Sequence, residues 1–255
     1  MERKSYDKSV DKKQVVYGMR PVIEALDSDA TIDKVYIQNG LSGNLVSELK
    51  SILRQKEVPF QYVPVEKLNK ITSNNHQGVV AYIAPISYVS ALELLPRLME
   101  RDVPPFVLLL DHITDVRNLG AIVRTAECTG VDAIVVPDRG SAQINEDAIK
   151  TSSGALLRVP ICRESNLKTV LNLARQLDMQ ICAASEKASV NYLEVDFKLP
   201  TLLIMGSEET GVSNELLKLS HKCAKLPILG QVQSLNVSVA AAVFMYEVLR
   251  QRSRP

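Results

Sequence analysis

The side chains best suited to bind a polar ligand gather in three stretches, each preceded by an apolar run. The stretches are DHITDVRN at residues 111–118, GSEETGVS at residues 206–213 and ILGQVQSLN at residues 228–236. They combine carboxylates, amides, hydroxyls and guanidinium groups with glycines, which let a backbone turn sharply or approach a ligand closely. These residue types can hold a substrate and position reacting atoms, so we expect the functional site to be built from these stretches.

The first stretch continues into a helical pattern that carries two arginines. Arg117 and Arg124 are seven residues apart, which places them near one face of a helix beside the small residue Gly120. A ligand could approach the backbone there, although an ion pair between Arg124 and Glu127 explains the same pattern. Asn118 by default would be the N-cap of this helix. The stretch with its helix, DHITDVRNLGAIVRTAE at residues 111–127, holds one glycine where a dinucleotide fingerprint needs three.

The second and third stretches each allow a simple and a functional interpretation. Gly206 and Gly211 can form an ordinary turn between a strand and a helix, or wrap a ligand through backbone groups with Glu208 aimed into the site. In the third stretch, Ser234 or Asn236 begins a helix whose free N–H groups can serve a ligand. Three alanines follow at residues 240–242 and let another segment pack very close.

The composition narrows the class of protein. With 255 residues, 46% hydrophobic and 23% charged, the chain can bury one or two cores, and its net charge of +1 leaves any basic binding surface local. Four dispersed cysteines and three histidines lack the spacing of a disulfide framework or a zinc site. We find no signal peptide and no apolar run of roughly 18 residues. We therefore expect a cytoplasmic protein that binds no membrane and no metal.

Apolar periodicity divides the chain into four parts. Residues 1–14 are polar without periodicity, and we predict a disordered tail. Residues 15–86 predict a small α/β domain, and residues 87–105 predict a helical linker that ends at Pro104 and Pro105. Residues 106–255 alternate strands and helices, which indicates a mostly parallel sheet that is covered on both faces and binds ligands at the carboxyl ends of its strands. This directs attention to the three stretches above and to a fourth loop, PDRGSAQ at residues 137–143. Its predicted strands are residues 106–111, 132–137, 158–162, 180–185, 201–205 and 223–228.

Together, the three stretches and their flanks resemble the SpoU/TrmH family of RNA ribose methyltransferases, within the SPOUT superfamily. The matching blocks are DHITDVRNLGAIVRTAECTGVDAIVVP, LLIMGSEETGVS and LPILGQVQSLNVSVAAAVFMYEVLRQR, in this order. Upstream, VYGMRPVIEAL and HQGVVAYIAP look like the start and end of the SpoU substrate-binding domain, a small α/β domain that binds RNA. The resemblance covers nearly the whole chain after the tail. It is greatest to members that methylate a guanosine of 23S rRNA.

The resemblance implies a fold, a cofactor and an assembly. The C-terminal half would be a parallel-sheet α/β domain tied in a trefoil knot, one of the rare exceptions to unknotted chains. S-adenosylmethionine would bind within the knot, held largely by backbone groups. The family works as a homodimer, with the C-terminal helix in the interface and the active site where two chains meet. By position, the cofactor-binding residues would be Gly206, Leu226, Ile228 and Leu235.

The catalytic candidates can also be carried over residue by residue. The sequence departs from the family pattern at Val116, where a proline is usual, and at Val212, where leucine or methionine is usual. Neither departure removes a polar group that the reaction needs. The catalytic candidates are Asn118, Arg124, Glu208, Ser234 and Asn236.

The implied reaction transfers a methyl group from a sulfonium to a ribose 2′-oxygen and needs no metal. Arginine is a poor base because its pKa is above about 12, so we expect Arg124 to grip the adjacent phosphate and stabilise the developing alkoxide. The proton would leave through water or phosphate. Three alternatives stay open: the same chemistry on tRNA or another rRNA nucleotide, a non-catalytic protein of RNA binding or ribosome assembly, and a generic nucleotide-binding enzyme, which the missing glycines oppose.

Overall fold

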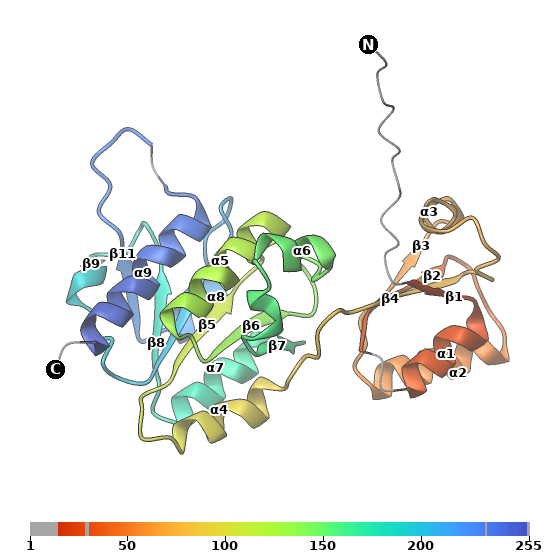
Figure 1. Ribbon diagram of the computed structural model, residues 1–255, viewed down its shortest axis with the longest axis horizontal. Helices are drawn as coiled ribbons and strands as arrows, with labels where there is room; N and C mark the ends of the chain where they lie inside the picture. The colour runs from red at the N-terminus through yellow and green to blue at the C-terminus, as the bar shows by residue number, and fades with distance from the viewer. Residues whose placement is uncertain (1–14, 29–30, 233, 254–255) are drawn as a thin grey trace, which may run out of the picture. The chain divides into compact units, whose positions relative to one another are not determined.

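The computed structural model describes residues 15–28, 31–232 and 234–253 (Figure 1). The chain divides into two compact units, Met1–Pro85 and Ile86–Pro255. The predicted tail, residues 1–14, lies outside the described residues. In the described part, no helix is both long enough and apolar enough to span a bilayer.

The first unit is a four-stranded sheet with helices on both faces. The strand order is β1-β4-β2-β3, with β4 antiparallel to both neighbours and β2 parallel to β3. Alternate residues of a strand point to opposite faces, so Val35 and Ile37 of β2 pack with α1 and α2, while Tyr36 joins the cluster under α3. The elements are β1 (Val15–Tyr17), α1 (Met19–Asp27), β2 (Ile32–Gln38), α2 (Asn44–Gln55), β3 (Phe60–Val63), α3 (Val65–Ile71) and β4 (Val79–Ile83).

A seven-stranded sheet forms the centre of the second unit. Its order is β7-β6-β5-β10-β8-β11-β9, and every neighbouring pair is parallel, which confirms the predicted parallel sheet. The elements are α4 (Ala91–Met99), β5 (Phe106–Leu110), α5 (Val116–Thr129), β6 (Ala133–Pro137), α6 (Glu146–Thr151), the 3-10 helix η1 (Ala155–Leu157), β7 (Ile161–Glu164), α7 (Leu167–Gln176), β8 (Gln180–Ala184), β9 (Val190–Asn191), the 3-10 helix η2 (Tyr192–Glu194), β10 (Thr201–Met205), α8 (Asn214–Leu219), β11 (Lys222–Lys225) and α9 (Val237–Arg252).

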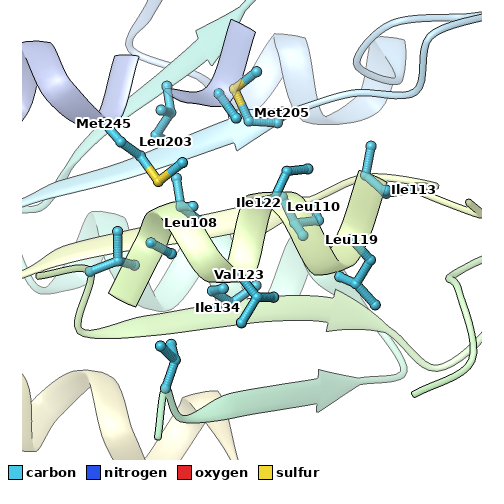
Figure 2. Close-up of a cluster of buried hydrophobic side chains, with 14 of the residues drawn as sticks. Leu108, Leu110, Ile113, Leu119, Ile122, Val123, Ile134, Leu203, Met205 and Met245 are labelled. Atoms are coloured by element: carbon cyan, nitrogen blue, oxygen red, sulfur yellow. The ribbon is translucent and has the colours of Figure 1, made fainter. Parts of the chain in front are cut away.

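Strand β5 shows why helices cover both faces of this sheet. All five of its residues are buried, so neither face can be left to water. Leu108 and Leu110 pack in the cluster with α5 and α9, and Figure 2 shows them beside Ile122 of α5. Val107 and Leu109 point the other way, into the cluster with α4, α7 and α8.

The strand order reverses between β5 and β10. From β5 the chain runs outward to β6 and β7, and the later strands build the other side of the sheet. The loops that follow β5 and β10 therefore leave neighbouring strands at the same edge, where the Asp111 N–H donates to the Met205 carbonyl at 2.8 Å. Open parallel sheets bind ligands at such a reversal.

Several boundaries differ from the prediction, and the strand predicted at 158–162 lies at Ile161–Glu164 as β7. Within residues 87–105, expected as a linker, α4 buries Ala91, Leu95 and Leu98 in the core of the second unit, so this unit begins at Ile86. An amphipathic helix needs such a partner for its apolar face. The last predicted strand, 223–228, already ends at Lys225 as β11, because Pro227 has no N–H to continue the ladder.

Candidate active site

Two adjoining cavities lie at the carboxyl ends of the strands around the reversal. The first cavity, about 300 Å³, is bounded by the loops after β8, β10 and β11 and by the start of α9. The second cavity, about 470 Å³, is bounded by the loop after β5, the first turn of α5 and the loop after β10. Residues 207–210 and Val237 belong to both walls. Ligands in the two cavities would therefore meet at the loop that follows β10.

The first cavity brings together all four residues expected to bind a cofactor, and Ser234 with them. Gly206 can only be a glycine, because a Cβ there would lie 2.0 Å from the carbonyl carbon of Gly211 and 2.1 Å from the nitrogen of Val212. The loop closes on itself through the Gly211 N–H, which donates to the Ser207 carbonyl at 3.0 Å. Gly206 therefore offers backbone atoms alone to the cavity. The other three are Leu226, Ile228 and Leu235.

Three of the catalytic candidates form one hydrogen-bonded cluster. Asn118 Nδ2 donates to Glu208 Oε1 at 3.0 Å, and Asn236 Nδ2 donates to Asn118 Oδ1 at 3.0 Å and also to Glu208 Oε1. The N–H of Val237 donates to the same Glu208 oxygen at 3.2 Å. One carboxylate oxygen thus joins the start of α5, the loop after β10 and the start of α9. These segments come together although Asn118 and Asn236 are 118 residues apart in sequence.

Asn236 has a second task, because it is the N-cap of α9. Its Oδ1 accepts from the N–H of Ser238 at 3.0 Å, which satisfies one of the free donors of the first turn. The two ends of one amide are therefore both engaged, so its orientation is fixed. Of the two residues predicted to begin this helix, Ser234 and Asn236, the structure selects Asn236.

Asp115, and not Asn118, caps α5. Its Oδ1 accepts from the N–H groups of Arg117 at 2.6 Å and Asn118 at 3.3 Å, so the helix begins at Val116. A carboxylate is favoured there by the partial positive charge of the helix N-terminus. The predicted capping role of Asn118 is wrong, and its side chain is free to join the cluster with Glu208.

Arg124 lies apart from the other catalytic candidates. It is exposed on α5 and lines neither cavity. The alternative partner considered for it, Glu127, instead pairs with Arg158 at 3.2 Å. The expectation that a ligand could approach the backbone at Gly120 is wrong, because a Cβ there would lie 2.6 Å from Cβ of Thr151. This glycine lets α5 pack against α6.

Reasoning from the sequence missed residues 184–187 of the site, and it named Asp111 only as part of the first stretch, without its role. Residues 184–187 after β8 line the first cavity, and their only signal was a polar turn after an apolar strand. Asp111, 2% exposed, holds the loops after β5 and β10 together. Its Oδ1 lies 2.6 Å from Nδ1 of His112, and its Oδ2 accepts from the N–H of Ser213 at 2.8 Å. The partner Ser213 is 102 residues away, so no local pattern could reveal this contact.

Comparison with known proteins gives the class of this chain. The SpoU rRNA Methylase family model matches residues 105–246, and the model for RNA 2′-O ribose methyltransferase substrate binding matches residues 15–89. A protein of Staphylococcus saprophyticus, provisionally named a TrmH family tRNA/rRNA methyltransferase, is 34% identical over 239 residues, which is 94% of this chain and 96% of that protein. The chain therefore belongs to the SpoU/TrmH family of RNA methyltransferases, as the sequence motifs predicted.

Solved structures share this architecture. The SpoU methyltransferase AviRb from Streptomyces viridochromogenes, in complex with the cofactor AdoMet, aligns with a TM-score of 0.59 at 25% identity over 93% of this chain and 90% of that chain. The A. aeolicus TrmH/SpoU tRNA modifying enzyme aligns with a TM-score of 0.54 at 34% identity over 64% of this chain and 84% of that chain. Among the described residues, no group of three or more His, Cys, Asp and Glu side chains is placed to hold a metal ion.

Proposed function

We propose that this protein transfers a methyl group from S-adenosylmethionine to a ribose 2′-hydroxyl of RNA in the cytoplasm, and that the substrate is a guanosine of 23S rRNA. The observation that carries this proposal is the pair of cavities around one loop. The residues expected to hold the cofactor line the first cavity, whereas Asn118 lines the second and Glu208 lines both. A methyl donor in one cavity and an acceptor ribose in the other would meet beside Glu208.

The first cavity suits S-adenosylmethionine in size and in lining. Its volume of about 300 Å³ is at the lower end of the range for small-molecule sites. Leu226, Ile228 and Leu235 offer apolar contact to an adenine ring, and Gly206 presents backbone groups to polar atoms. Glu208 places negative charge at the shared wall, where it favours a cation. When bound, the cofactor supplies an activated methyl group on a positively charged sulfur, and we propose that the surrounding loops belong to a trefoil knot.

The amide cluster leaves groups for the acceptor. Asn118 Nδ2 uses one hydrogen toward Glu208 and has a second, and Glu208 Oε2 lies outside the cluster. Ser234 adds a hydroxyl from the wall of the first cavity. We assign these groups to binding and orienting the ribose oxygens, and we assign to Asn236 the task of holding Asn118 and Glu208 in place. Holding reacting groups in line supplies much of the rate in such a transfer.

A homodimer would give a role to two features that a single chain leaves unexplained. Helix α9 carries an uncharged stripe outside the core at Val239, Ala242, Val243 and Tyr246, with helical spacing. Val239 is 49% exposed and Tyr246 is 54% exposed. We propose that this stripe packs against a second copy of the chain. In that assembly Arg124, which lines neither cavity of its own chain, would reach the acceptor phosphate of a site shared by two chains.

The first unit would bind the RNA, and tRNA is the second candidate substrate. The A. aeolicus tRNA modifying enzyme is 34% identical over 64% of this chain, and the S. saprophyticus relative, whose name includes both RNAs, is 34% identical over 94%. Labelled S-adenosylmethionine should be offered with unmodified rRNA and tRNA, and the modified position mapped by primer-extension stops.

The proposal expects label in a ribose of 23S rRNA, and it expects Glu208→Ala to abolish this label. The matched control is Glu215→Ala, which removes a carboxylate of the same unit that pairs with Lys168 at 2.8 Å and lines neither cavity. Label in tRNA and not in rRNA would show that the substrate is tRNA instead of 23S rRNA. Calorimetry without S-adenosylmethionine binding, together with tight RNA binding, would instead indicate a non-catalytic protein.

A further inference from the structure

We propose that His112 accepts the proton of the ribose 2′-hydroxyl during methyl transfer and that Asp111 positions it. The inference rests on the proposed function and deepens it. The 2′-oxygen must lose its proton as it gains the methyl group, and arginine is a poor base for this step. His112 lines the second cavity together with Asn118 and Glu208. An imidazole is the side chain best matched to proton transfer near neutral pH.

The contact with Asp111 determines which nitrogen of His112 is available. Nδ1 lies 2.6 Å from Asp111 Oδ1, and Asp111 Oδ2 is engaged by the N–H of Ser213. An ionised carboxylate has no hydrogen to give, so Nδ1 carries the hydrogen and Nε2 keeps its lone pair. A buried carboxylate behind an imidazole serves the same purpose in hydrolase triads, where it fixes the tautomer and stabilises the imidazolium that forms.

The surroundings hold the ring while leaving it accessible. The His112 side chain is 59% exposed, whereas that of Asp111 is 2% exposed. His112 has a φ of 60°, a left-handed conformation that few non-glycine residues adopt and that is often found at functional sites. Gly140 approaches the Cδ2–Nε2 edge of the ring so closely that a Cβ there would lie 2.7 Å from His112 Cδ2 and 3.2 Å from Nε2. The ring is therefore confined between Asp111 and the loop after β6.

The other carboxylates of the second cavity are less suited to the task. Asp115 is committed to the cap of α5, and Glu208 Oε1 already accepts three hydrogen bonds that hold the cluster together. Glu209 lines the same cavity and is the rival base. Both candidates can be tested by substitution.

The proposed step balances without a further reactant. The 2′-oxygen forms a bond to the methyl carbon while the bond between that carbon and sulfur breaks, and the bonding electron pair stays on sulfur, which becomes neutral. The proton passes from the 2′-oxygen to His112 Nε2, and the positive charge now lies on the imidazolium beside Asp111. Water removes the proton before the next turnover.

The tautomer of His112 can be measured without any reaction. Nitrogen-15 NMR of the full chain should show His112 with a protonated Nδ1 and a bare Nε2. His76 is an internal reference of the opposite kind, because its Nδ1 accepts from the N–H of Gly78 at 3.0 Å. Asp111→Asn should remove the preference of His112 for this tautomer. A wild-type His112 protonated at Nε2 with a bare Nδ1 would overturn the proposal.

Single-turnover methylation tests the role itself. His112→Ala should lower the rate by about 10²–10⁴-fold while S-adenosylmethionine binding by calorimetry stays within about twofold. Added imidazole should restore part of the rate of His112→Ala but not of His112→Gln, whose side chain fills the space. An active wild type whose His112→Ala variant is unimpaired, or whose Glu209→Gln variant alone is inactive, would overturn the proposal and leave the proposed function standing. A wild type that methylates no RNA would overturn both.

Discussion

Replacing Gly206 by alanine should damage both the fold and the first cavity. The added Cβ would lie 2.0 Å from the carbonyl carbon of Gly211, and ordinary contacts begin at about 3.4 Å, so the 211–212 peptide would have to retreat by about 1.4 Å. Overpacking typically costs about 1–3 kcal/mol, and we expect about 3 kcal/mol because the obstacle is backbone. For a chain of this size that corresponds to a fall in Tm of about 6–12 °C.

Thermal unfolding and calorimetric titration with S-adenosylmethionine measure the two effects of this substitution. The matched control is Gly230→Ala, in the loop before α9, where an added Cβ meets nothing within 4 Å. We expect the control to unfold and bind like the wild type, and Gly206→Ala to lose detectable binding. If Gly206→Ala unfolds within about 2 °C of the control and binds the cofactor equally well, the close approach of the two peptides is not what shapes this cavity.

Three further predictions concern the rest of the second unit. Arg252 donates to the carbonyl groups of Pro104, Pro105, Phe197 and Leu199, so Arg252→Met should lower the free energy of unfolding in urea by about 3 kcal/mol, and Arg252→Lys should recover little of it. Burial raises the pKa of the Cys162 and Cys182 thiols from 9.0 to about 12. Between these two values the folded chain keeps protons that the unfolded chain has lost. The contribution of the thiols to the free energy of unfolding should therefore be complete below about pH 9 and decrease as the pH rises to about 12. Cys182→Ala should weaken this fall in urea titrations, and replacement of the exposed Cys128 should not. Arg124→Ala and Glu208→Ala should each be inactive alone. If Arg124 acts in the partner's site, an equal mixture of the two variants that has exchanged subunits should regain about a quarter of the wild-type sites, because half of its dimers are mixed and each mixed dimer has one intact site; no recovery would place Arg124 in its own chain's site.

Local patterns predicted the elements well where one physical rule dominates. The buried strand 106–110 and the amphipathic helices are set by apolar periodicity, and the structure places them as expected. The prediction failed where a choice depends on distant partners. The helix at 91–99 reads as a linker because its apolar face shows no partner in sequence, and the partner is the sheet that follows. Asp115 caps α5, and the Asn118 side chain instead contacts Glu208, which lies far along the chain.

The sequence named candidate site residues but not the arrangement of their side chains. Motifs alone named Asn118, Glu208 and Asn236, and the structure unites them in one cluster. The pairing of Asp111 with His112 had no such signal, because a histidine next to an aspartate is unremarkable until its ring is seen to turn back on a buried carboxylate. Arg124 lines neither cavity of its own chain, and under the proposed homodimer its role would depend on the second copy.

The cluster also has a consequence for synthesis and folding. Its members span 118 residues, and the cap that completes it precedes a helix that begins at Val237 in a chain of 255 residues. Contacts of such long range form late, since loop closure must precede any gain from the contacts. The sheet can therefore form before the cluster does, and the cofactor stabilises only chains in which the start of α9 has joined the loops after β5 and β10. Ligand binding then requires that the second unit has folded as far as α9.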